Sequence, residues 1–125
     1  MIFGIGTDIV RIDRLLQLWN RHGQRGAERL LAPSELADFA LARDKGRFLA
    51  KRFAAKEAFA KALGTGIRPP ATFSAIAVDH DVLGKPRFAF QGPLAEKMSE
   101  ESLTAHLSIS DEADYAMAYV ILEKR

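Results

Sequence analysis

The chain has 125 residues, of which 48% are hydrophobic and 27% charged, and its formal net charge is +2. These values suit one soluble globular domain over residues 1–125, and no apolar run approaches the ~20 residues that span a bilayer. The sequence contains no cysteine, which excludes disulfides and thiolate metal sites, and no basic signal region, so we expect a cytoplasmic protein without a membrane partner.

The first predicted element is a strand over residues 2–10, which are mostly apolar and β-branched. Gly4 and Gly6 lie inside it, and a glycine within a strand often marks either a β-bulge or the close approach of another backbone. Asp8 stands where this strand ends and the chain turns toward the next element.

Two helices are predicted next. Apolar residues over 12–19 have the spacing of an amphipathic helix, and Gly23 and Gly26 are expected to break it. Pro33 begins a second, short helix that reaches about residue 41, because proline is tolerated in a first helical turn.

A basic segment covers the first predicted helix. Residues 11–29 hold five arginines but only two acidic residues. Such a segment either forms a solvated helix face or attracts an acidic partner. A non-enzymatic module that binds RNA or an acidic protein is the competing class of function. It gives no reason for Asp8 and Glu57, which would repel phosphate, and the chain lacks interleaved aromatic residues for base stacking, so we expect no nucleic-acid partner.

The strongest helix prediction covers residues 46–63, which are rich in alanine and free of internal proline and glycine after the first position; Gly64 ends the helix. Glu57 and Lys61 lie one turn apart, roughly opposite an apolar face, and Phe53 adds apolar surface beside them. We therefore expect this helix to be buried on two sides, with the charged pair partly shielded.

The rest of the chain predicts four strands and one short helix. The strands are expected at 75–78, 86–90, 105–109 and 115–122, and the helix at 94–98. The resulting order, β-α-α-α-β-β-α-β-β, predicts an α+β fold with an antiparallel sheet.

Generic catalytic motifs are absent. The run Gly4-Ile5-Gly6 is too short for a dinucleotide fingerprint, and glycines 64 and 66 follow a helix, whereas a phosphate loop precedes one. No Gly-x-Ser-x-Gly nucleophile motif occurs, and the three histidines are too scattered for a zinc site.

The remaining candidates are charged residues at element ends and inside the alanine-rich helix: Asp8, Arg52, Lys56, Glu57 and Lys61. A carboxylate on a strand end and one on a helix can share a magnesium ion, which typically takes one or two protein carboxylates and leaves its other positions to water and phosphate. Lys61, one turn beyond Glu57, would then face the same phosphate. The alternative is an ordinary Glu57–Lys61 pair worth about 0.3–0.5 kcal/mol, with Asp8 simply ending a strand.

Five ordered segments, taken together, closely resemble the holo-acyl-carrier-protein synthase family of phosphopantetheinyl transferases. They are GIGTDIV (4–10), RFLAKRFAAKEAF (47–59), KALGTGI (61–67), LGKP (83–86) and HLSIS (106–110). The resemblance covers nearly the whole chain, and the total length is also typical of the family.

The resemblance implies that the chain transfers the 4′-phosphopantetheine arm of coenzyme A to a serine of apo-acyl carrier protein. The products would be the holo-carrier and 3′,5′-ADP, the reaction would need Mg²⁺, and it would support fatty acid biosynthesis. The implied fold packs an antiparallel sheet against a long central helix and shorter helices. The implied assembly is a homotrimer whose active sites are shared between adjacent subunits.

The resemblance also implies roles for individual residues. Asp8 and Glu57 match the magnesium ligands, and Lys61 matches a lysine beside the coenzyme A pyrophosphate; these three are the expected catalytic residues. Arg14 and Arg21 match arginines that bind the acidic second helix of the carrier. The segments that line the coenzyme pocket contain Gly64, Thr65, Gly66, Pro86, His106 and Ser108. We expect Arg52 and Lys56 to pair with the adenosine 3′-phosphate or with a neighbouring subunit.

Three roles stay open. Either Glu57 or a metal-bound water would take the serine proton. His106 is either a satisfied strand residue or a ligand contact. Asp111 stands where some family members carry histidine, so a mechanism that uses an imidazole there does not apply. Asp111 either points at the nucleophile or serves the turn, to which aspartate is suited.

Overall fold

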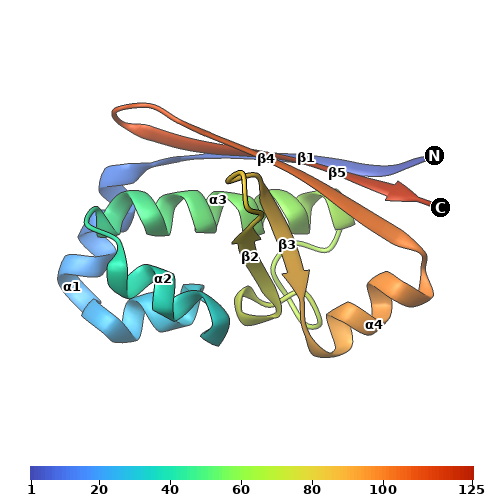
Figure 1. The fold of residues 1–125 in the computed structure, drawn as a ribbon, viewed down its shortest axis with the longest axis horizontal. Helices are drawn as coiled ribbons and strands as arrows, with labels where there is room; N and C mark the ends of the chain where they lie inside the picture. The colour runs from blue at the N-terminus through green and yellow to red at the C-terminus, as the bar shows by residue number, and fades with distance from the viewer.

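The computed structural model describes residues 1–125 and has a long central helix between a three-stranded sheet and a layer of smaller elements (Figure 1). The elements are β1 (Ile2–Arg11), α1 (Ile12–Leu30), α2 (Leu36–Leu41), α3 (Lys45–Leu63), β2 (Ile76–His80), β3 (Pro86–Phe90), α4 (Gly92–Glu100), β4 (Leu103–Asp111) and β5 (Tyr115–Lys124). Short 3₁₀ turns occur at Pro33–Glu35 and Phe73–Ala75. This order confirms the predicted α+β succession.

The strands form two separate antiparallel sheets. The larger sheet has the order β1-β5-β4, and β2 and β3 form a hairpin of their own. The larger sheet crosses one side of α3, while α1, α2, the β2–β3 hairpin and α4 lie on the other side (Figure 1). The two chain ends meet at one end of the sheet, where the terminal amine of Met1 donates to the carbonyl oxygen of Lys124 at 3.0 Å.

The larger sheet has one buried and one open face. Along β5, Ala116, Ala118, Val120 and Leu122 are buried against the core, whereas the alternate residues Tyr115, Met117 and Tyr119 are exposed. Side chains alternate between the two faces of a strand, so the exposed set shares the outer face with its neighbours on β1. The large exposed apolar side chains on that outer face include Ile5 and Ile9 of β1 and Tyr115, Met117 and Tyr119 of β5.

Helix α3 is buried on both sides, as the sequence predicts. Ala54, Ala55, Ala58 and Phe59 have no exposed surface, and they contribute to one core of 26 buried residues. All of this burial comes from the chain itself. Large exposed apolar side chains therefore gather on the outer face of the sheet, and none of them lies on α3.

Helix α1 is longer than predicted. It reaches Leu30 and is only interrupted at Gly23, whose φ of 57° and ψ of −141° are far from helical values. Gly26 does not break the helix, which corrects the prediction. The glycine is needed there for packing, because a Cβ atom would come within 2.9 Å of the side chains of Leu18 and His22. The helix continues because its buried face packs onto the core on both sides of the kink. None of the helices combines the length and apolar character needed to cross a membrane.

Candidate active site

Asp8 reaches the polar edge of α3 because β1 lies directly on that helix. Gly4 and Gly6 face α3, and a Cβ atom on either would collide with a carbonyl oxygen of the helix. Of the two alternatives predicted for these glycines, the close backbone approach is confirmed at both, since a larger residue would push the strand away from α3.

Asp8 and Lys61 form an ion pair at this edge. Nζ of Lys61 lies 3.2 Å from Oδ1 of Asp8, and it also donates to the carbonyl oxygen of Thr7 at 3.0 Å. The Asp8 side chain is 17% exposed and that of Lys61 is 54% exposed, so the pair is open to a ligand from solvent. Glu57 lies one turn before Lys61 on α3 and is half-buried.

Glu57 is a perturbed carboxyl group. Partial burial raises its pKa above the usual value, and the negative charge of Asp8 raises it further. The positive charges of Lys61 and Arg14 act in the opposite direction. Asp8, Lys61 and Arg14 are therefore all within electrostatic range of Glu57, as expected of a functional site.

The two carboxylates suit a magnesium ion. The chain has no group of three or more His, Cys, Asp or Glu side chains that could form an all-protein metal site. Magnesium does not require one, because it typically binds one or two carboxylates and keeps water or substrate phosphate as its other ligands. A cation would also relieve the repulsion between Asp8 and Glu57 that raises the Glu57 pKa. Asp8 and Glu57 are the residues that could hold it.

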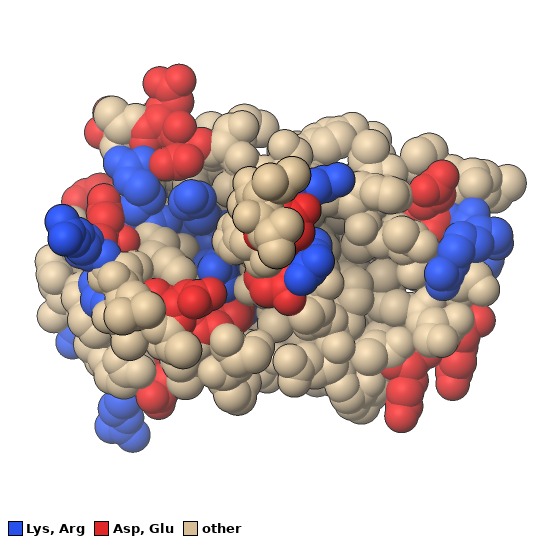
Figure 2. Space-filling view, in the orientation of Figure 1, with Lys and Arg blue, Asp and Glu red and all other residues tan.

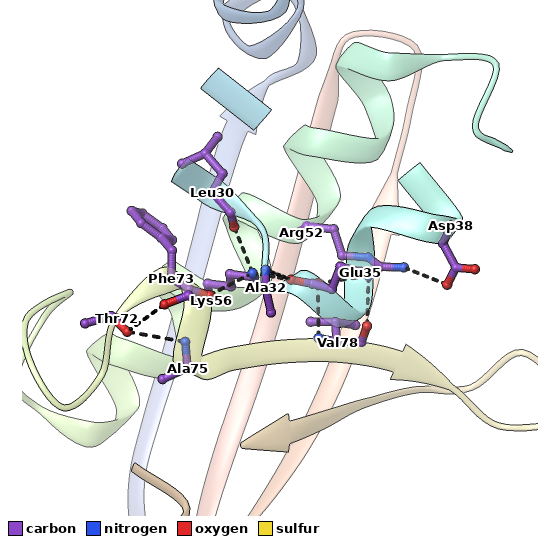
Figure 3. Close-up of polar contacts among 11 residues, drawn as sticks. Leu30, Ala32, Glu35, Asp38, Arg52, Lys56, Thr72, Phe73, Ala75 and Val78 are labelled. Atoms are coloured by element: carbon purple, nitrogen blue, oxygen red, sulfur yellow. Dashed lines mark hydrogen bonds and ion pairs between the residues drawn. The ribbon is translucent and has the colours of Figure 1, made fainter. Parts of the chain in front are cut away.

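A buried ionic cluster lies along α3 beside this site (Figure 3). The carboxylate of Glu35 accepts hydrogen bonds from Nη1 of Arg52 at 2.9 Å and from Nζ of Lys56 at 2.5 Å. It also accepts from the backbone N–H groups of Ala32 at 2.8 Å and Val78 at 3.1 Å. Every buried side-chain polar atom has a partner, so the cluster is fully satisfied.

This cluster corrects the expectation for Arg52 and Lys56. Lys56 is fully buried and also donates to the carbonyl oxygens of Leu30 and Phe73, so it reaches neither a coenzyme nor a neighbouring subunit. Arg52 is 5% exposed and donates to the carbonyl oxygen of Val78 as well as to Glu35, so its guanidinium is already paired within the chain. Burial dominates the electrostatics here and lowers the pKa of Lys56 to about 8, against the opposing charge of Glu35.

Sequence reasoning missed Glu35. Two signals could have found it. Pro33 followed two residues later by glutamate is typical of a first helical turn in which the glutamate caps a backbone N–H. In addition, Arg52 and Lys56 lie on a helix predicted to be buried on two sides, and buried cations require a buried anion.

Asp111 serves the β4–β5 turn, which resolves one of the open roles. Its carboxylate lies 2.7 Å from Nη1 of Arg47, which also donates to the carbonyl oxygens of Glu112 and Ala113. Asp111 also lies 3.9 Å from Nζ of Lys51. Figure 2 shows the acidic tip of this hairpin at the upper left, with basic side chains directly beneath it. Arg47 therefore holds the turn against the start of α3. Asp111 stabilises the turn through this ion pair and not through a hydrogen bond to its own backbone.

Three of the residues expected to line the coenzyme pocket meet in one hollow of about 410 Å³. Pro86 comes from β3, and His106 and Ser108 come from β4. His106 Nε2 lies 2.9 Å from Oε1 of Glu123, and both side chains are half-exposed, so the ring stays accessible to a ligand.

The other expected coenzyme residues lie elsewhere on the chain. Gly64 ends α3 in the left-handed conformation with φ 91°, and Thr65 Oγ1 donates to the carbonyl oxygen of Gly66. These residues follow Lys61 by one turn, so they adjoin the Asp8–Lys61 pair and do not line the hollow of Pro86 and His106. Within one chain, the predicted coenzyme residues thus form two separate groups.

The two predicted carrier-binding arginines are both exposed on α1. The guanidinium carbon of Arg14 lies 5.5 Å from the centroid of the Phe53 ring on α3. Arg21 lines a second hollow, of about 490 Å³, together with Arg25 and Arg29 beyond the kink at Gly23.

Comparison with known proteins gives one consistent result. A family model described as the 4′-phosphopantetheinyl transferase superfamily matches residues 4–120. A holo-[acyl-carrier-protein] synthase of Dechloromonas aromatica is 68% identical over 123 residues, and the match covers 98% of this chain and 98% of the relative.

Solved structures agree with this result. The crystal structure of a holo-[acyl-carrier-protein] synthase from Neisseria meningitidis has a TM-score of 0.95 and 49% identity, and covers 99% of this chain and 100% of its own. A holo-(acyl-carrier-protein) synthase from Bacillus anthracis, solved in complex with CoA (3′,5′-ADP), has a TM-score of 0.85 and 35% identity. It covers 100% of this chain and 99% of its own.

Proposed function

This chain belongs to the 4′-phosphopantetheinyl transferase superfamily, and we infer that it transfers the 4′-phosphopantetheine arm of coenzyme A to a serine of apo-acyl carrier protein. The products are the holo-carrier and 3′,5′-ADP. The observation that carries this function on the chain itself is the meeting of Asp8, Glu57 and Lys61 at an open edge of α3. We further propose that the reaction supports fatty acid biosynthesis, and that residues 1–125 act as one cytoplasmic domain.

We propose that the reaction depends on a magnesium ion held by Asp8 and Glu57. Bound there, the ion would neutralise charge on the pyrophosphate oxygens of coenzyme A. Phosphoryl-type transfer needs little covalent chemistry from the protein, which mainly positions groups and stabilises charge. The carrier serine hydroxyl attacks the phosphorus next to pantetheine, and the bond from that phosphorus to the 3′,5′-ADP oxygen breaks. Either Glu57 or a water molecule on the ion would take the serine proton.

Lys61 is proposed to stabilise the leaving phosphate. An ammonium group has three N–H donors, and Thr7 and Asp8 engage two of those of Lys61. The third is free to donate to a phosphate oxygen. The half-exposed position of Lys61 lets the ligand reach it from solvent. Gly64, Thr65 and Gly66, one turn further on, are proposed to line the coenzyme pocket beside it.

A homotrimer is proposed to complete the coenzyme site. Pro86, His106 and Ser108 line a hollow that also includes Tyr119 and Ile121 of β5, so the hollow adjoins the outer face of the sheet. Large exposed apolar patches mark interaction surfaces. Association through this outer face would cover Ile9 and its apolar neighbours and would bring the hollow of one subunit to the Asp8–Lys61 edge of the next. A closed ring of three uses such head-to-tail contacts.

Carrier binding is proposed for the exposed face of α1. Arg14 and Arg21 offer positive charge to the acidic second helix of the carrier, and complementary charges speed encounter and set register. Arg52 is not proposed as a phosphate ligand, because its guanidinium is buried and already donates to Glu35 and to the carbonyl oxygen of Val78.

The experiment that tests the function is intact-mass spectrometry of an apo-carrier after incubation with the protein, coenzyme A and magnesium. We expect the carrier to gain the mass of one phosphopantetheine, and a carrier with alanine in place of its serine to gain nothing. A carrier whose mass stays unchanged, with a folded protein, would contradict the proposed function.

A further inference from the structure

Arg14 and Phe53 form a contact between the carrier-binding helix and the catalytic helix. The Arg14 guanidinium lies over the Phe53 ring, 5.5 Å from its centroid, within the range of a cation–π interaction. Arg14 belongs to α1 and is exposed, whereas Phe53 belongs to α3 and is half-buried. The Phe53 ring is therefore expected to be less mobile than the Arg14 side chain.

Phe53 is itself held in place from behind. Its ring lies 5.8 Å from the ring of Phe73 in a tilted arrangement. The carbonyl oxygen of Phe73 accepts a hydrogen bond from Nζ of Lys56 at 2.9 Å, and Lys56 pairs with buried Glu35 (Figure 3). A chain of contacts thus connects the buried ionic cluster to the ring beneath Arg14.

The position of the ring matters because Phe53 lies one turn before Glu57 on α3. Because the Arg14 guanidinium lies over that ring, it stands about one helical turn from Glu57, at the boundary between the exposed face of α1 and the Asp8–Glu57 site. An exposed arginine otherwise has a long, flexible side chain with much rotamer freedom to lose on binding. A ring that holds the guanidinium beforehand reduces this loss.

We propose that Phe53 is a positioning residue for carrier docking: its ring fixes the Arg14 guanidinium at the edge of the Asp8–Glu57 site. An acidic side chain of the carrier that pairs with Arg14 is then held where the carrier serine can reach this site. The inference rests on the docking role proposed for Arg14.

A double-mutant cycle on the full-length protein tests the inference, with Phe53→Leu and Arg14→Gln made singly and together. The readouts are the KM for an acyl carrier protein, the KM for coenzyme A and kcat. Phe53→Leu is expected to raise the carrier KM about two- to fivefold, the factor that a partly exposed cation–π contact supplies. It should have a smaller effect when Arg14 is already glutamine, while the KM for coenzyme A stays constant. Phe53→Tyr, which keeps a ring face, should retain the wild-type carrier KM.

Phe48→Leu is the matched control, because Phe48 lies on the same helix, packs against another phenylalanine ring and lies beneath a different arginine, Arg52, at 4.4 Å. Its effect should be independent of Arg14→Gln. If Phe53→Leu fails to fold, Phe53→Met serves in its place, since methionine is flexible and fills irregular space.

The outcomes separate the two claims. A raised carrier KM in Arg14→Gln, combined with an equal effect of Phe53→Leu in both backgrounds, overturns the positioning role and leaves Arg14 docking intact. An unchanged carrier KM in Arg14→Gln contradicts the docking role itself and overturns the positioning role with it.

Discussion

Nζ of Lys56 lies 2.5 Å from Oε1 of Glu35, at a place where neither side chain reaches solvent. The same carboxylate also pairs with Arg52, so one anion balances two cations on the buried side of α3. The cluster joins α3 to the end of α1, to the turn before α2 and to β2. It therefore fixes the helix that carries Glu57 and Lys61 without taking part in their chemistry.

Loss of the Glu35 charge should destabilise the fold strongly. In Glu35→Gln, Arg52 and Lys56 would stay buried without their counter-charge, and breaking a buried ion pair in this way costs about 3–5 kcal/mol. Urea unfolding measures the change. The control is Asp79→Asn, which removes the exposed Asp79–Arg87 pair and should cost at most ~1 kcal/mol. Equal losses in the two variants would contradict the role given to the buried cluster.

The lowered pKa of Lys56 makes a prediction about pH. The folded protein releases this proton near pH 8, whereas an ordinary lysine has a pKa of 10.5. Between these values the unfolded chain binds the proton and the folded chain does not, so the contribution of Lys56 to the free energy of unfolding increases with pH. Wild type should therefore gain stability relative to Lys56→Met as pH rises through this window. A difference that is constant or shrinks in urea unfolding at two pH values would argue against a lowered pKa.

The outer face of the sheet should control assembly. Ile9 is 64% exposed in the single chain, so Ile9→Glu should leave the subunit folded but place a charge inside a subunit interface. Light scattering should give the mass of three chains for wild type and a smaller mass for Ile9→Glu. Leu41→Glu is the control, because Leu41 is 84% exposed but lies on α2, away from the sheet. A fully active wild-type monomer would remove the shared-site proposal.

Charge reversal on α1 should act on the carrier and not on coenzyme A. Arg14→Glu is expected to raise the KM for the carrier at least ~5-fold, the factor that about 1 kcal/mol of an exposed pair corresponds to. The KM for coenzyme A should hardly change. Salt should slow the wild-type reaction at low carrier concentration, because exposed charges are screened beyond ~8 Å at physiological ionic strength. Arg125→Glu is the control, since Arg125 lies at the far end of the molecule from α1 (Figure 1). Equal salt dependence and equal carrier KM in Arg14→Glu and wild type would show that α1 is not the docking surface.

The elements that sequence predicts best are those with clear periodicity and turn residues. The β3 strand occupies its predicted residues, and α3 differs from its predicted start by one residue. Gly4 and Gly6 are informative because glycine weakens a strand, so two of them within one strand indicate that another backbone comes close. The predicted break at Gly23 is confirmed as a kink, whereas Gly26 is misleading, because a local breaking signal cannot show that core packing continues the helix beyond the kink.

Contacts between distant segments are the limit of sequence reasoning at the site. Asp8 and Lys61 meet because β1 packs on α3. Residue periodicity predicts the strand and the helix but not their contact, so the family resemblance is needed to pair the two residues. Local signals can suggest that Glu35 is buried, but its spacing in the sequence does not identify its partners on α3. Helix α2 and a loop lie between them, and their geometry cannot be predicted from spacing. The same holds for Arg47 and Asp111, which are 64 residues apart in the chain but meet at one turn.

The most direct test of the central claim is the metal dependence of phosphopantetheine transfer by Asp8→Asn, Glu57→Gln and wild type. Each variant should keep the wild-type fold by circular dichroism and lose at least ~100-fold in turnover, as expected when charge stabilisation at a phosphoryl centre is removed. Wild type stripped with EDTA should be inactive and should regain transfer when magnesium is added. Full turnover after thorough chelation, or in either folded variant, would contradict a magnesium site formed by these two carboxylates.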